Sequence, residues 1–75
     1  MTLQQLQQHL NNHKLYVNVE ETQTHFIINV EWGDWKHDHG HLMYLMANLG
    51  FTLDRREITN TDGSDCFSAI YYFNK

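Results

Sequence analysis

Residues 32–51, WGDWKHDHGHLMYLMANLGF, decide the fold that this sequence predicts. Four apolar side chains recur at the three- and four-residue spacing of an amphipathic helix: Leu42, Leu45, Met46 and Leu49. We therefore expect a helix at about residues 37–49. The carboxylate of Asp34 or Asp38 can cap its first turn, and Gly50 suits the position after its last turn, where φ is positive.

Alternating apolar and polar residues predict two strands on each side of this helix. The four predicted strands are residues 15–20, 25–32, 51–59 and 66–73. The second strand should direct four side chains toward the core: Phe26, Ile28, Val30 and Trp32. In the third strand Arg55 and Glu57 would follow Leu53 into the core, so we expect a β-bulge or an early exit of the chain from the sheet there.

A further helix is predicted at residues 2–14, where Thr2 can cap a stripe of leucines formed by Leu3, Leu6 and Leu10. The order helix–strand–strand therefore occurs twice, which suggests an αββ repeat. We expect a single α+β domain, in which one antiparallel sheet of four strands carries both helices on one face. A turn is expected at residues 60–64, with Gly63 at positive φ.

This order is similar to that of the homing endonucleases of the LAGLIDADG type. Neither predicted helix ends in a carboxylate that would supply the metal ligand of that family. Nothing of their activity is therefore carried over to this chain.

Composition narrows the classes of function. The chain has 75 residues, a formal net charge of −4 and one cysteine, so an internal disulfide is excluded. The acidic balance argues against general nucleic-acid binding, which rewards clustered lysine and arginine. The start of the chain, MTLQQLQQ, lacks the apolar core of a signal peptide, and no apolar run is long enough to span a bilayer. We expect a cytoplasmic protein without membrane contact.

The candidate metal ligands form one cluster in the run K-H-D-H-G-H: His37, Asp38, His39 and His41. On a helix the imidazoles of His37 and His41 face the same side, and imidazoles with a carboxylate suit zinc, nickel or copper. No other cofactor is expected. The alternative is a polar helix start, in which Asp38 acts as a cap and the imidazoles lie in solvent. Such a segment would also be sensitive to pH.

No motif of an enzyme accompanies these residues. Cys66 has the chemistry of a nucleophile, but a cysteine within a strand is more commonly a small core residue. The sequence contains neither a nucleophile-elbow pattern around Ser64 or Ser68 nor a glycine-rich phosphate loop. We therefore expect a protein without enzymatic activity.

Two short helices cover one face of a four-stranded sheet and leave the other face open. The residues expected on the open face are Tyr16, Asn18, Ile27, Asn29, Thr52, Arg56, Ser68, Ile70 and Tyr72. Among them, the expected partner-binding residues are Tyr16, Ile27, Arg56, Ile70 and Tyr72. The sequence thus predicts a protein-interaction module of the adaptor or inhibitor type. Its partner is either a second copy, in a symmetric homodimer, or another protein. Stacking of single-stranded nucleic acid is the remaining alternative.

Overall fold

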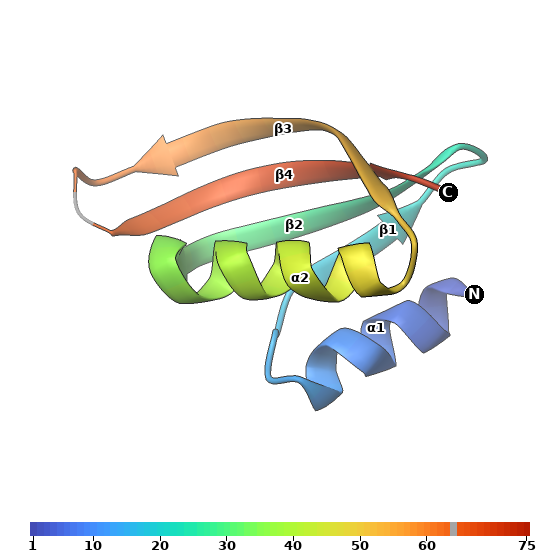
Figure 1. Ribbon diagram of the computed structural model, residues 1–75. Helices are drawn as coiled ribbons and strands as arrows, with labels where there is room; N and C mark the ends of the chain where they lie inside the picture. Colours follow the sequence, from blue (N-terminus) through green and yellow to red (C-terminus); the bar gives the residue numbers. More distant parts are fainter. Residues whose placement is uncertain (64) are drawn as a thin grey trace.

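The computed structural model describes residues 1–63 and 65–75, which form one four-stranded sheet and two α-helices (Figure 1). The elements are α1 (Leu3–Asn12), β1 (Asn18–Glu21), β2 (His25–Asp34), η1 (Trp35–His39), α2 (Gly40–Asn48), β3 (Thr52–Thr61) and β4 (Cys66–Asn74). The strand order is β1-β2-β4-β3, and every neighbouring pair is antiparallel. The α+β architecture that the sequence predicts is therefore confirmed.

Helix α1 begins with a capping box. The Thr2 hydroxyl accepts from the Gln5 backbone N–H, and the Gln5 side chain accepts from the Thr2 N–H. Farther along the helix, the Gln7 amide donates to the Val17 carbonyl at 2.8 Å and accepts from the Val19 N–H at 3.2 Å. Gln7 thereby satisfies backbone groups on the outer edge of β1, which protects that edge from further strand pairing.

Strand β1 starts at Asn18, later than the predicted residue 15. Asn18 is paired with Asn29 of β2, and the next residues of β2 in that direction lead into a register shift between Val30 and Gly33. The β1–β2 pairing begins at Asn18, and Leu15 is nevertheless buried.

The central helical segment begins at Trp35, two residues before the predicted start. Its first five residues wind as a π-helix, η1, and α2 follows directly. The Asp34 carboxylate accepts from the Lys36 N–H at 3.0 Å, and the Asp38 carboxylate accepts from the Asp34 N–H at 2.6 Å. Both aspartates that the sequence proposes as caps therefore bind backbone donors at this end.

The end of α2 is a Schellman motif around Gly50, as the sequence predicts. Gly50 has φ of +86°, its N–H donates to Ala47, and the N–H of Phe51 donates to the Met46 carbonyl at 3.0 Å. The chain reverses there and enters β3.

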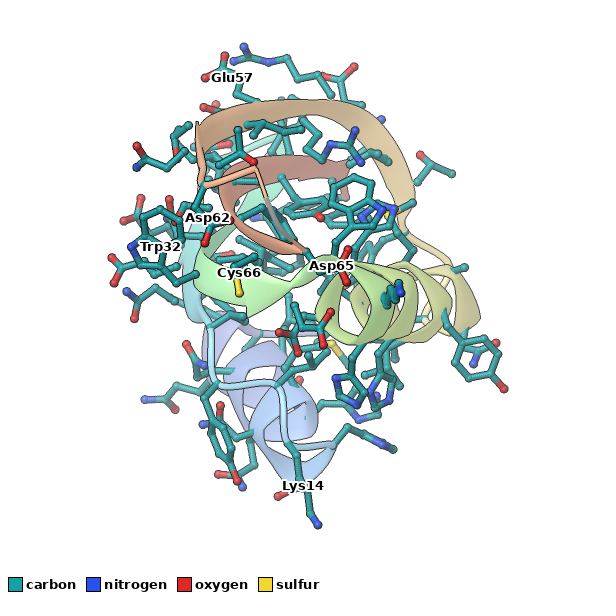
Figure 2. The ribbon with its side chains drawn as sticks, turned by 90° about the vertical axis from the view of Figure 1, so that its left-hand side faces the viewer. Lys14, Trp32, Glu57, Asp62, Asp65 and Cys66 are labelled. Carbon is teal, nitrogen blue, oxygen red and sulfur yellow. The ribbon has the colours of Figure 1, made fainter. Side chains whose placement is uncertain are left out.

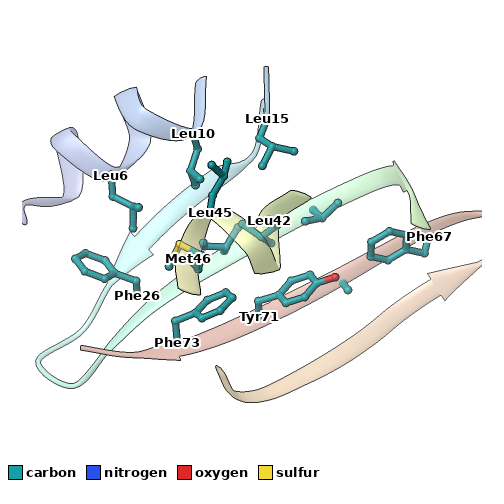
Figure 3. Close-up of a cluster of buried hydrophobic side chains, with 13 residues drawn as sticks. Leu6, Leu10, Leu15, Phe26, Leu42, Leu45, Met46, Phe67, Tyr71 and Phe73 are labelled. Atoms are coloured by element: carbon teal, nitrogen blue, oxygen red, sulfur yellow. The ribbon is translucent and has the colours of Figure 1, made fainter. Parts of the chain in front are cut away.

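The core lies between the two helices and one face of the sheet (Figure 3). The helices contribute Leu6, Leu10, Leu42, Leu45 and Met46, and Leu15 adds to them from the connection after α1. The sheet contributes Phe26, Ile28, Val30, Phe67, Ala69, Tyr71 and Phe73. Every second residue of each strand faces the core, which confirms the side-chain directions predicted for β4 and for β2 as far as Val30.

An irregularity in β2 moves one side chain out of its predicted phase. Trp32 was expected in the core, but the register shift between Val30 and Gly33 leaves its side chain 56% exposed and turns Gly33 inward. The bulge predicted in β3 is confirmed by a register shift between Leu53 and Arg55. Strand β3 continues to Thr61, so the first two residues of the turn predicted at 60–64 belong to the strand. Gly63 has the expected positive φ, +82°, and Ser64 lies outside the described residues.

Candidate interaction surface

The face of the sheet opposite the helices carries three of the predicted partner-binding residues. Ile27 is paired directly with Tyr72, and Ile70 is paired with Asn29, two pairs farther along the same two strands and therefore next on the same face. Their positions alternate with the buried core residues of β2 and β4, so they lie on the side of the sheet away from the helices. The three side chains are half-buried, and as neighbours on this face they form its apolar centre.

The prediction that Arg56 belongs to this face is wrong. The bulge after Leu53 shifts the strand by one residue, so Arg55 is paired with Tyr72 and Arg56 with the buried Tyr71. Arg55 therefore takes the position expected for Arg56. Its guanidinium carbon lies 3.9 Å from the centroid of the Tyr72 ring, and its Nη1 donates to Glu57 at 2.8 Å.

Arg56 instead joins an aromatic cluster on the covered side. Its guanidinium carbon lies 4.7 Å from the centroid of Trp35, and the Trp35 ring stacks on His39 at 4.3 Å with an interplanar angle of 3°. His39 Nδ1 is 2.7 Å from the hydroxyl of Tyr71. Burial, and secondly the positive charge of Arg56, lower the pKa of His39, whereas burial raises the pKa of Tyr71.

Trp32 is a member of the open face that sequence reasoning missed. Its backbone has φ of +50°, which is rare for a bulky side chain, and its N–H donates to the hydroxyl of Ser68 at 2.9 Å. Ser68 is only 6% exposed. Figure 2 shows Trp32 projecting from the side of the molecule away from α2. The signal available in the sequence was Gly33, since a glycine inside a strand pattern often marks a bulge.

Tyr16 lies beside this end of the face rather than within a strand. Its side chain is 79% exposed and lines a hollow together with Trp32 and Glu31. A second hollow, of 240 Å³, connects Trp32 to Ile70 across β2, β4 and β3. The structure thus links Tyr16 to the apolar centre through Trp32.

Carboxylates surround the open face. Glu20 is paired with Ile27, Glu57 with Ile70, and Glu31 follows Asn29 along the same side of β2. Arg55 lies among them and is bonded to Glu57, and Lys14 lines the hollow that Tyr16 shares with Trp32 and Glu31. Two lysines bind carboxylates elsewhere, because Lys36 pairs with Asp65 and Lys75 pairs with Glu21. The open face is therefore acidic around an apolar centre.

The predicted metal ligands are only partly brought together. The rings of His37 and His41 lie 5.5 Å apart, but His39 turns toward Trp35 and Tyr71. Both oxygens of Asp38 are occupied, one by the Asp34 N–H and the other by Nδ1 of His37. Within residues 1–63 and 65–75, no group of three or more His, Cys, Asp or Glu side chains is arranged to hold a metal ion.

Helix α1 brings two further imidazoles to this place. The ring of His13 lies 6.0 Å from that of His41, and the ring of His9 lies 4.8 Å from that of His13. His9, His13, His41 and His37 thus form a row between the two helices. The sequence shows that His9 and His13 share a helix face, but only the tertiary packing places His13 beside His41.

Cys66 is exposed at the start of β4, so the expectation that it is a small core residue is wrong. It borders a hollow of 230 Å³ lined also by Trp35, Ile58, Thr61, Asp65 and Phe67. That lining contains no histidine to serve as a base for the thiol.

No family model, no curated protein and no solved structure matches this chain. In the part of the chain that the structure describes, no helix is long and apolar enough to cross a membrane.

Proposed function

We propose that this protein is a non-enzymatic interaction module that binds another protein through its open sheet face. The observation that carries the proposal is the exposed, large aromatic side chain of Trp32. The backbone N–H of Trp32 donates to the hydroxyl of the buried Ser68, which holds the side chain outward. It continues into the apolar centre formed by Ile27, Ile70 and Tyr72. Aromatic residues with a polar surround are characteristic of protein-binding surfaces.

The charge of this face favours a different, basic protein over a second copy. In a symmetric homodimer this acidic face meets its own copy, so carboxylates such as those of Glu20 and Glu31 would face a surface of the same charge. A basic surface would instead be attracted by these carboxylates, and a steered encounter would be weakened by salt. An inhibitor that occupies the basic surface of a nucleic-acid-binding protein is one function of this kind.

The experiment compares partner capture by three purified proteins in extracts of the cell that makes this chain. Wild type should retain a partner, and the double variant Trp32→Ala, Tyr72→Ala should lose it. The matched control is Tyr44→Ala, because Tyr44 is 65% exposed on α2, away from the open face. Loss of the partner in the Tyr44 variant alone would contradict the proposal. Light scattering at micromolar concentration should show that the wild type is a monomer. If the wild type is instead a dimer and the double variant is a monomer, the partner of the open face is a second copy of this chain.

A second candidate function is metal binding, and the position of His13 beside His41 favours it. The two helices together present neighbouring imidazoles, and zinc, nickel and copper accept such ligands. An ion held by two of them would complete its coordination with water.

Zinc titration of the tag-free protein tests this candidate. Zinc should raise the melting temperature of wild type, and His41→Ala should remove the rise. His25→Ala is the control, because His25 is bonded to Asp54 and lies apart from the row. An untagged sample that shows no thermal shift with zinc, nickel or copper would exclude the function.

A further inference from the structure

The hollow beside Trp32 has walls of a definite chemical kind. Trp32 and Glu31 border it from β2, and Ile70 and the buried Ser68 lie across it on β4. The remaining lining residues are Asn29, Val30, Thr59, Asn60 and Ala69. The residues that line this space of 240 Å³ thus include one aromatic, one acidic and two amide residues, and no lysine or arginine is among them.

We infer that this hollow receives a lysine or arginine side chain of the protein partner. The inference rests on the proposed function and names the group that the open face recognises. A cation is attracted to the face of an indole ring, and tryptophan is the strongest of the aromatic side chains in this respect. The Glu31 carboxylate supplies the opposite charge, and Ile70 supplies apolar surface for the methylene groups of the stem.

The same chain shows this kind of contact in its other tryptophan. The guanidinium of Arg56 lies 4.7 Å from the centroid of Trp35 on the covered side. Trp35 therefore already has its cation, whereas Trp32 keeps 56% of its surface exposed. A phosphate group does not fit the hollow beside Trp32, because the lining includes a carboxylate and lacks a basic group.

The position of Trp32 is fixed by the backbone. A bulky residue at φ of +50° is held against its usual preference by the surrounding structure, and the bond from its N–H to Ser68 is one of the contacts that hold it. Such strain is common at binding sites. The ring is therefore held outward before the partner arrives, which reduces the cost of ordering it on binding.

The test uses two capped tripeptides, Gly-Arg-Gly and the same peptide with citrulline, which has nearly the shape of arginine without its charge. Heteronuclear NMR follows the indole N–H signals of Trp32 and Trp35 during titration. The arginine peptide should shift the Trp32 signal saturably and leave the Trp35 signal in place. The citrulline peptide should bind more weakly by about fivefold.

Two charge-neutralising variants complete the test. Glu31→Gln should weaken binding of the arginine peptide by a similar factor. Glu21→Gln removes the same charge at a carboxylate that is bonded to Lys75 and lies off the open face, so it should change the affinity by less than about twofold. If the two peptides bind with equal affinity, the hollow recognises a neutral group and not a cation. If neither peptide shifts the Trp32 signal, the hollow is not a binding site for this side chain. If the double variant loses the partner but the arginine peptide does not bind the wild type, this inference is refuted and the proposed function stands. If the arginine peptide binds the wild type at Trp32 but the double variant still captures the partner, the proposed function is refuted and the peptide site stands.

Discussion

Tyr71 and Tyr72 are adjacent in β4, and each has an arginine of β3 near its ring, but they lie on opposite faces of the sheet. Tyr71 is fully buried beneath the helices, where its hydroxyl is bonded to His39. Tyr72 lies on the open face, with Arg55 stacked on it at 3.9 Å. The same pair of residue types therefore supports the core on one side and forms a surface on the other.

This difference separates stability from recognition in a chain of 75 residues. The covered face holds the buried cluster, so its side chains should determine the free energy of unfolding. The open face has no layer of structure above it among the described residues, and it keeps Trp32 exposed. Its side chains should therefore affect binding more than folding.

The largest expected effect is the difference in unfolding free energy between alanine variants of Tyr71 and Tyr72. Tyr71→Ala should lower the free energy of unfolding by about 3–5 kcal/mol, because it leaves a cavity in the core. Tyr72→Ala should lower it by less than about 1 kcal/mol, because the ring is only half-buried and its cation–π contact is near the surface. Urea unfolding of the two variants measures both values. Similar losses in the two proteins would mean that the open face is part of the structural core.

A smaller effect is expected at Ser68, a polar side chain of the open face that is buried. Ser68→Ala removes the acceptor of the Trp32 N–H and should cost about 1–3 kcal/mol. Hydrogen exchange at the Trp32 amide should accelerate by more than exchange at the Ile28 amide, which lies farther along β2. If exchange at Trp32 is unchanged, another contact holds the bulge.

The smallest effect concerns His39 on the covered side. Its pKa is lowered below 6.5 in the folded state, chiefly by burial, so the unfolded chain binds a proton more readily. The contribution of His39 to stability is therefore complete above pH 6.5 and decreases as the pH falls toward the folded-state value. Unfolding above and below pH 6.5 should show a steeper loss for wild type than for His39→Gln. Parallel losses would show that His39 is not responsible.

The fold could be predicted because its determinants are local and periodic. The leucine stripes, the alternation in β2 and β4, and the glycine after α2 each specify an element without knowledge of the rest. The predictions of side-chain direction are wrong where one extra residue in a strand moves the following side chains to the opposite face of the sheet. Trp32 leaves the core after the irregularity in β2, and Arg55 replaces Arg56 after the bulge in β3. A bulge was expected in β3, but its position depends on pairing with β4. The row of histidines depends in the same way on how the two helices pack.

The central claim is that the open face binds the partner, and site-specific photo-cross-linking tests it most directly. A benzophenone amino acid replaces Tyr72 on the open face or Tyr44 on the exposed side of α2, and the protein is irradiated in the cell that makes it. We expect one cross-linked product, containing a basic protein, from position 72 and none from position 44. A product from position 44 alone, or equal yields from both positions, would contradict the account.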